Sequence, residues 1–402
     1  MSNKRAAEKI VRQLRQLGYE ALLAGGCVRD MLLGRRANDY DVATSAKPEN
    51  VMKIFCRTVK VGAKFGVVIV LLGDEQVEVA TFRTEGGYTD GRHPGHVKFS
   101  TAKKDAKRRD FTINGMFYDP IERRVIDYVD GRADLKKNLI RTIGKATERF
   151  GEDYLRMLRA VRFSTKLGFE IESETYKSIR RTAEKINLIS GERIAMELEG
   201  IITNANRETG VEMLLDCGLA KQIFDGFEGE KARTAIKVLG VLPNKISFPL
   251  GLAGMFIDWN EEEGLRRCER LKLSRGQLKH IKFLLNNRGV LLDAEMSLSK
   301  LRRLAAESYF GDLYQYQRAI QKAAGESTTA LNKIKRRVME LGDIVLTPRP
   351  LLDGYELMRL GAKAGPALGQ LAEEMYVAQL DGHIKTAEQA RQWVKERLRS
   401  DK

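Results

Sequence analysis

The sequence predicts an α+β protein in which a strand-rich N-terminal part is followed by an all-helical remainder. Short apolar runs separated by glycine turns continue to about residue 145, which is typical of a mixed β-sheet. After Gly144 the apolar residues recur at helical spacing, and no alternating run of strand length follows. The 402 residues are too many for one ordinary domain, so we expect two to four compact units.

The composition favours a folded, basic protein with a polyanionic partner. Hydrophobic residues make up 43% of the chain and only 8 residues are proline, which argues against disorder. The formal net charge of +16 favours nucleic acid over a membrane as partner, although some basic proteins bind neither. No apolar run suits a signal peptide or a spanning helix, so we expect a cytoplasmic protein with no membrane contact and no fixed protein partner.

The cysteines and histidines argue against a zinc site. The 4 cysteines include no C-x-x-C pair and the 4 histidines no His-Asp pair, so the usual structural and hydrolytic metal motifs are missing. Scattered cysteines of this kind suit a reducing compartment.

The stretch from residue 22 to residue 41 organises the N-terminal part. An amphipathic helix over residues 5–18 precedes it. Residues 22–24 are predicted to end a buried strand, and Gly25 and Gly26 to turn the chain into a short helix over residues 28–33.

Asp39 and Asp41 flank Tyr40 at the start of a second predicted strand, residues 40–43. Residues i and i+2 of a strand point to the same side, so the two carboxylates should converge. Two like charges at such a short distance repel each other strongly unless a cation neutralises them. Mg²⁺ is usually held by one or two carboxylates together with substrate phosphates. We therefore predict a catalytic metal site at Asp39 and Asp41, although a D-x-D by itself is more often a turn.

The order strand, glycine turn, helix and acidic strand resembles the nucleotidyltransferase superfamily that includes DNA polymerase beta. The combination is more specific than either motif alone. The resemblance implies a polymerase-beta-like head with a mixed sheet.

Two further strands are predicted over residues 67–72 and 76–82, after a helix over residues 49–55. Glu78 lies in the second of these strands, and it could equally face the aspartates as a third carboxylate or face solvent. Residues 84–98 are rich in glycine and charge, which is typical of a flexible loop that acts as a lid.

Residues 105–120 combine cations with polar groups. The run ending at Arg109 is followed by Asp110 and Asn114. Arginine pairs suit polyphosphates, and Asp or Asn side chains can bond ribose hydroxyls. A basic run is also common on a solvated face, and from this segment alone we would prefer that interpretation.

A helix predicted over residues 152–163 carries arginines at a strict spacing. Asp153, Arg156, Arg159 and Arg162 follow one another every three residues beside a stripe of apolar residues. Arginine and aspartate side chains can together offer donors and acceptors to the pairing edge of a base. This pattern favours a wall that recognises a planar, polar ligand.

The C-terminal half is helical and basic. A helix over residues 190–202 begins after Ser190, a capping residue. Basic residues crowd residues 266–282 and 333–337, with tyrosines between the two groups. These segments could bind an RNA backbone or could equally be a solvated exterior.

Five motifs identify the family that the chain resembles. GGCVRD with DYD, RRDFTING, DYVDG, EDYLRMLRAVRF and SGERIAMELE are similar, in order, to those of class II tRNA nucleotidyltransferases and bacterial poly(A) polymerases. Residues 351–390 also resemble the tail of CCA-adding enzymes. The resemblance implies a catalytic head (1–145), a neck that recognises the base (146–205), an RNA-binding body (206–345) and a tRNA-binding tail (346–402).

The resemblance also implies a role for each site residue. Asp39 and Asp41 would hold two Mg²⁺ ions, and Gly26 and Arg29 would contact the triphosphate, with Gly25 in the same turn. The other residues would bind the nucleotide: Arg109, Asp110 and Asn114 at the ribose, Asp153 and Arg156 as the protein template for the base, and Arg159 and Arg162 completing the pocket.

The implied reaction is template-independent addition of CCA, from CTP and ATP, to the 3′ end of tRNA by two-metal nucleotidyl transfer. The full-length segment 84–98 argues against an enzyme that adds only CC. An enzyme that adds only the terminal A, or a poly(A) polymerase, stays open. A non-catalytic RNA-binding protein is the rival from another class, but it would have no reason to keep Asp39, Asp41 and Asp153 together.

Overall fold

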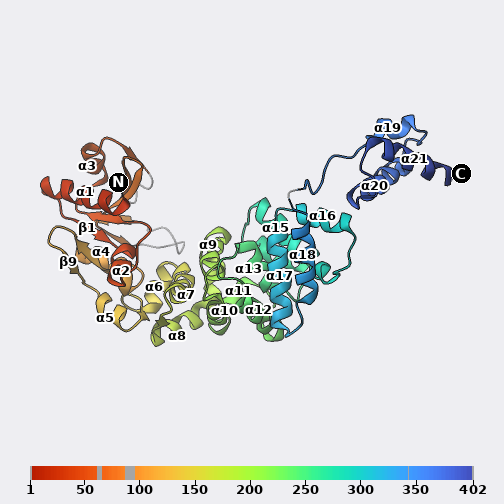
Figure 1. Cartoon of the computed structure of the whole chain (residues 1–402). Coiled ribbons are helices and arrows are strands. Elements are labelled where there is room, and N and C mark those ends of the chain that lie inside the picture. Colours follow the sequence, from red (N-terminus) through yellow and green to blue (C-terminus); the bar gives the residue numbers. More distant parts are fainter. Residues whose placement is uncertain (1, 61–65, 87–95, 343, 401–402) are drawn as a thin grey trace. The chain divides into compact units, whose positions relative to one another are not determined.

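The computed structural model describes residues 2–60, 66–86, 96–342 and 344–400. The chain divides into two compact units, and neither is a single stretch of sequence. Unit 1 comprises Met1–Ala232 with Glu269–Leu273, and unit 2 comprises Arg233–Cys268 with Ser274–Lys402. Figure 1 shows the strands in the N-terminal part, coloured red to orange, and helices over most of the rest.

Unit 1 is built on a seven-stranded mixed sheet with the order β3-β4-β5-β2-β1-β8-β9. β1 is antiparallel to both β2 and β8, whereas β2 and β5 are parallel with Val42 opposite Val79. The strands are β1 (Ala21–Ala24), β2 (Asp41–Thr44), β3 (Thr58–Val59), β4 (Val67–Leu72), β5 (Glu75–Thr81), β8 (Phe117–Asp119) and β9 (Arg124–Ile126). The predicted mixed sheet is confirmed.

Short helices connect and cover these strands. α1 (Asn3–Gln16) buries Ile10, Val11 and Leu14, because residues at this spacing share one helix face. α1 is followed by Gly18, whose φ of 81° is readily adopted only by glycine. The other helices of this part are α2 (Gly26–Leu32), α3 (Pro48–Ile54), α4 (Ala102–Arg108), the 3₁₀ helix η2 (Thr112–Asn114) and α5 (Gly131–Lys136).

Two predictions for this part need correction. The acidic strand begins at Asp41 and not at residue 40, so Asp39 precedes the strand and the i, i+2 argument does not apply to the pair. The predicted continuous loop over residues 84–98 has paired ends, because β6 (Arg83–Gly86) and β7 (His96–Phe99) form an antiparallel hairpin. Residues 87–95 of that prediction lie outside the described residues.

The rest of unit 1 is helical, as predicted, apart from a short strand. β10 (Leu139–Ile140) pairs in parallel with β11 (Glu170–Ile171), which the sequence analysis did not anticipate. The predicted helix over residues 152–163 is interrupted at Asp153, whose backbone is extended (φ −153°, ψ 104°). The helices are α6 (Ala146–Glu152), α7 (Leu155–Leu167), α8 (Ser173–Thr182), η3 (Ala183–Leu188), α9 (Gly191–Ile202), α10 (Arg207–Asp216) and α11 (Leu219–Ile223).

In the described residues, unit 2 contains helices and no strands. α12 (Gly229–Val241) enters it, and α13 (Phe248–Met255) is buried along its whole length against α15 and α17. A separate core around Leu357, Met375 and Val394 holds the last three helices together. The remaining helices are α14 (Glu261–Glu269), α15 (Arg275–Asn286), η4 (Val290–Leu292), α16 (Leu298–Ala306), α17 (Phe310–Ala323), α18 (Thr329–Glu340), α19 (Gly354–Arg359), α20 (Pro366–Leu380) and α21 (Ala387–Ser400).

No helix in the described part of the chain has both the length and the apolar character needed to cross a membrane.

Candidate active site

A cleft of about 500 Å³ in unit 1 brings together most of the predicted site residues. Strands β1, β2 and β5 line it together with helices α2, α7 and α9. The predicted residues in its lining are Gly25, Gly26, Arg29, Asp41, Glu78, Arg109, Asp110, Asn114, Asp153, Arg156 and Arg159. Asp39 and Arg162 do not line the cleft.

Asp41 and Glu78 form an acidic corner in this cleft. The parallel register of β2 and β5 places residue 41 beside residue 78, and both side chains line the cleft. Glu78 is exposed and lines the same cleft as Asp41, so its role as a third carboxylate stays a prediction. Partial desolvation by the surrounding protein, followed by the charge of Glu78, raises the pKa of Asp41 to about 6, although Arg109 opposes this.

The donor set of this corner fits a divalent cation. Asp39 is exposed just before β2, and its charge also helps to raise the pKa of Asp41. Carboxylates that repel one another at close range gain most from a bound cation. Among the described residues, no three acidic, histidine or cysteine side chains form a complete metal site. A site with few carboxylates leaves coordination positions of the metal free, and substrate phosphates and water can fill these positions.

The glycine turn packs directly against an arginine of the cleft. Gly25 has a φ of 75°, and a Cβ atom there would lie 3.1 Å from Nη1 of Arg109. A side chain at residue 25 would therefore be strained and would displace this guanidinium group. Arg109 is also held by Asp105, whose carboxylate accepts hydrogen bonds of 3.1 Å from Nε and Nη2.

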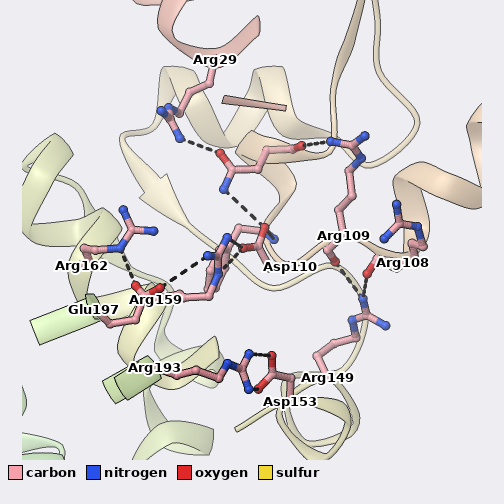
Figure 2. A network of polar contacts seen from close by, with 12 residues as sticks. Arg29, Arg108, Arg109, Asp110, Arg149, Asp153, Arg159, Arg162, Arg193 and Glu197 are labelled. Carbon is pink, nitrogen blue, oxygen red and sulfur yellow. Dashed lines mark hydrogen bonds and ion pairs between the residues drawn. The ribbon is translucent and has the colours of Figure 1, made fainter. Parts of the chain in front are cut away.

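A continuous polar network connects three arginines of the cleft, Arg29, Arg109 and Arg159 (Figure 2). Arg29, which is 3% exposed, donates a hydrogen bond of 2.7 Å to Oδ1 of Asn114. The side chain of Asn114 donates to Asp110, and the backbone carbonyl of Asn114 accepts from Arg109. Asp110 accepts hydrogen bonds of 2.6 and 2.9 Å from Arg159. One network thus runs from α2 to α7.

Asp110 and Arg159 form a partly buried ion pair within this network. Burial alone would raise the pKa of Asp110, but the charge and hydrogen bonds of Arg159 outweigh it and lower the pKa to about 2. Asp110 therefore stays ionised at neutral pH, and it keeps Arg159 in place. Because Asp110 is already bonded to Arg159, its predicted bond to a ribose would compete with this pair.

Asp153 and Arg156 are each held by a further side chain. The carboxylate of Asp153 accepts hydrogen bonds of 2.7 and 3.3 Å from Arg193 and one from the backbone of Leu155. Arg156, 8% exposed, donates to Glu152 and to the carbonyl of Arg149. The helix is interrupted at Asp153, and this interruption allows the carboxylate of Asp153 to reach Arg193. The predicted continuous helix did not imply this contact.

Arg193, Glu197 and Phe163 are residues that the sequence analysis did not assign to the site. Arg193 and Phe163 line the cleft, and Glu197 pairs with both Arg159 and Arg162. The signal for the first two was available, because Arg193 and Glu197 lie four residues apart on one face of α9 within SGERIAMELE. Phe163 had the same kind of signal, since it follows Arg159 by four residues on α7 and so lies on the arginine face of the helix.

Arg162 differs from its predicted position in the pocket. Its Nε donates a hydrogen bond of 2.5 Å to Glu197, and its guanidinium carbon lies 4.4 Å from the ring centroid of Phe163. Gly200 packs against it so closely that a Cβ atom would lie 2.5 Å from Cδ of Arg162. Arg162 thus supports the wall of the cleft.

The sequence matches two known families over parts of unit 1. Residues 21–141 match the "Poly A polymerase head domain", and residues 168–230 match the "Probable RNA and SrmB- binding site of polymerase A". The first match contains the acidic corner and the glycine turn, and the second begins directly after α7.

Full-length relatives are CCA-adding enzymes. The chain is 34% identical to the CCA-adding enzyme of Lactobacillus johnsonii over 395 residues, which cover 96% of this chain and 95% of the relative. It is 31% identical to that of Geobacillus stearothermophilus over 408 residues, covering 97% and 96%. A crystal structure of the Bacillus stearothermophilus CCA-adding enzyme in complex with CTP superposes with a TM-score of 0.84 at 29% identity, covering 100% of this chain and 99% of that one. With this sequence relationship along nearly its whole length and this shared fold, the chain belongs to the CCA-adding enzymes, a family of tRNA nucleotidyltransferases.

Proposed function

We propose that this protein adds CCA to the 3′ end of tRNA, using CTP and ATP and no nucleic-acid template. The observation that carries the proposal is a cleft whose lining brings together the acidic corner, the arginines Arg29, Arg109 and Arg159, and the polar pair of Asp153 and Arg156. The names of the full-length relatives and the CTP complex of one of them support the same activity.

Asp41 and the neighbouring Asp39 would hold the metal ions, which we propose are Mg²⁺. When bound, Mg²⁺ lowers the pKa of a hydroxyl and neutralises developing charge on phosphate. In the reaction the tRNA 3′-hydroxyl loses its proton to solvent and its oxygen forms a bond to the α-phosphorus of the nucleotide. The bond from that phosphorus to the oxygen shared with the β-phosphorus breaks, and pyrophosphate leaves with the electron pair. Arg29 and Arg109 would bind the phosphates, because guanidinium groups match phosphate oxygens in charge and geometry.

Asp153 and Arg156 would select the base. A carboxylate only accepts hydrogen bonds and a guanidinium only donates them, so the pair can match the mixed edge of cytosine or adenine. Few hydrogen bonds separate these two bases, which limits discrimination and suits a site that accepts both CTP and ATP. Since both side chains are held by protein partners before a nucleotide binds, recognition costs little ordering.

We further propose the four-part division into head, neck, body and tail described above, with tRNA binding in the body and tail, and a cytoplasmic location. An A-adding enzyme and a poly(A) polymerase remain the alternatives, the latter because the head matches a family described by that activity.

One experiment separates these functions. The protein is incubated with tRNA transcripts that lack none, one, two or three of the 3′-terminal residues, and CTP and ATP are offered separately and together. CCA addition requires that the shortest transcript gain three residues with both nucleotides and that the complete tRNA gain none. Extension only of the transcript that lacks the last residue indicates an A-adding enzyme, and long adenylate tails indicate a poly(A) polymerase.

The first prediction concerns Asp41. Asp41→Ala should lower incorporation by at least about 10³-fold, because the several kcal/mol of charge stabilisation from a metal would be lost. Binding of tRNA, measured by filter retention, should stay within about twofold, since the cationic surfaces are unchanged. Chelation of divalent cations should cause the same loss of incorporation in the unmodified enzyme, and added Mg²⁺ should restore the incorporation.

The matched control is Asp74→Ala, which removes an exposed acid from the turn between β4 and β5. This variant should keep full activity. Substantial residual activity of Asp41→Ala, or an equal loss with Asp74→Ala, would rule out the metal assignment.

A further inference from the structure

Phe163 lies at the centre of the arginine cluster that forms one side of the cleft. Its ring, 6% exposed, is near the guanidinium carbons of three arginines. The distances to the ring centroid are 5.4 Å for Arg29, 5.4 Å for Arg159 and 4.4 Å for Arg162. Arg29 comes from α2, next to the glycine turn, whereas the other two come from α7.

Three guanidinium groups around one ring require an explanation. Cations repel one another, and each of the three is paired with a carboxylate, of Asp30, Asp110 or Glu197, whereas the ring is the group that all three share. The face of an aromatic ring carries partial negative charge and attracts each cation within about 6 Å of its centroid. Phe111 packs against the ring of Phe163 in a T-shaped arrangement, with the centroids 5.7 Å apart and the planes at 78°. A leucine would fill much of the same volume and would supply none of this attraction.

We propose that Phe163 is a positioning residue for nucleotide binding, which holds Arg29 and Arg159 in a fixed relation to each other. This inference rests on the proposed nucleotidyltransferase function. Arg29 belongs to the phosphate end of the cleft and Arg159 to the base end, and the ring contacts both. Phe163 therefore helps to set the spacing between the two ends, beside the hydrogen-bonded chain through Asn114 and Asp110, and it does so independently of which base is bound.

The proposal predicts how the kinetics change. Since both nucleotides carry the same triphosphate, losing the ring should raise KM for CTP and for ATP by the same factor. We expect an increase of about tenfold in Phe163→Leu, with kcat lowered less than KM is raised. Phe163→Tyr keeps the aromatic face and should restore KM to within about threefold of the unmodified enzyme.

The control is Phe169→Leu. Phe169 is equally buried, at 6% exposure, and lies just beyond α7 beside Tyr176 and Met213, in a different cavity. It reports the cost of losing a buried ring without a change to the arginine cluster. Thermal unfolding of all variants is measured in parallel, so that loss of stability is separated from loss of nucleotide binding.

The outcomes are distinct. If the unmodified enzyme fails to extend tRNA, the proposed function fails; if it is active and Phe163→Leu has the KM values of Phe169→Leu, only the positioning role fails. A change in the ratio of CTP to ATP use, or a Phe163→Tyr variant as impaired as Phe163→Leu, also overturns it. A double-mutant cycle tests the mechanism: in an Arg29→Lys background the effect of Phe163→Leu should shrink from about tenfold to about threefold. Independent, multiplying effects would show that the ring does not act through Arg29.

Discussion

At the scale of single residues, Asp153, the carboxylate that we propose reads the base, is held by an ion pair within the protein. Arg193 donates to both oxygens of Asp153, and the backbone of Leu155 donates to one of them. A carboxylate held in this way has a fixed orientation, and its remaining lone pairs point in fixed directions. If Asp153 selects the base as proposed, selection also depends on Arg193, which itself need not touch the base.

This dependence leads to the second prediction, at Arg193. Arg193→Gln should lower the discrimination between correct and incorrect nucleotides by about tenfold, because a charge-assisted hydrogen bond of about 1.5–3 kcal/mol that orients Asp153 is lost. The measurement compares kcat/KM for CTP, ATP, UTP and GTP on one transcript. Affinity for tRNA should stay unchanged.

Lys177→Gln serves as the control for Arg193→Gln. It breaks an exposed ion pair with Glu174 on α8, and such pairs contribute little. If Arg193→Gln selects nucleotides as well as Lys177→Gln does, Asp153 does not need its partner.

The site residues also show where reasoning from the sequence works at this scale. Motif resemblance was sufficient to assign Arg109, Asp110, Asn114 and Arg159 to one site, and all four line one cleft although Arg159 comes from a distant segment. It was not sufficient for Arg162, whose partner Glu197 comes from another helix. Contacts between distant segments depend on how the segments pack, and the spacing of residues within one segment does not predict this packing.

At the scale of elements, α9 depends on close backbone packing at its start. A Cβ atom on Gly191 would lie 1.6 Å from the carbonyl oxygen of Arg270, so no side chain fits without moving the backbone. Since Arg193 and Glu197 follow on the same helix, a shift here would be transmitted to the partners of Asp153 and Arg159.

The third prediction concerns this contact. Gly191→Ala should lower the free energy of unfolding by about 3 kcal/mol, the upper end for overpacking, because the clash is with backbone and not with a flexible side chain. Gly151→Ala in α6 is the control, since a Cβ atom there meets nothing within 4 Å. It should be neutral or stabilising by up to about 1 kcal/mol. Denaturant unfolding measures both, and equal stabilities would contradict the packing argument.

The element boundaries show what the sequence did and did not predict. β4 was predicted residue for residue, because its apolar run is bounded by glycine turns. The break between α6 and α7 was missed, since Asp153 and its neighbours have the spacing of a continuous helix face while the backbone at Asp153 is extended. The hairpin of β6 and β7 was missed because its strands carry little apolar pattern.

At the scale of the whole molecule, the charge of +16 is not spread over equivalent sites. Within residues 266–282, several cationic side chains already interact with other groups of the protein. Arg267 lies over the ring of Trp259, Arg270 donates to the carbonyl of Gln222, and Lys282 pairs with Glu261. Arg275 and Lys279 on α15 are exposed and better suited to phosphate contacts. The basic segment predicted as one surface therefore contains two kinds of residue.

The fourth prediction concerns these two. The double variant Arg275→Glu with Lys279→Glu should weaken tRNA binding about tenfold or more and reduce the slope of log K against log salt by roughly one to two. Lys9→Glu with Arg12→Glu, on the exposed face of α1, makes the same change in net charge and is the control. An unchanged slope in the α15 variant, or an equal loss in both, would show that α15 is an ordinary solvated exterior.

The overall class was predictable because composition and periodicity change so clearly near residue 144. The division into two units was not, because it depends on where residues 269–273 pack. Nothing in that short segment distinguishes it from its basic neighbours in the sequence.

The return of residues 269–273 to unit 1 has a consequence for how the protein is made. Arg270 donates to Asn187 and to the carbonyls of Ile186 and Gln222, and its own carbonyl packs on Gly191. A ribosome synthesises the chain from its N-terminus. Residues 269–273, which pack against the start of α9, are therefore missing until residues 233–268 have been synthesised. Every residue that lines the cleft has been translated well before then. The nascent chain thus holds the complete set of site residues before it holds the structure that stabilises them, and a fragment that ends at residue 232 would stay permanently at that stage.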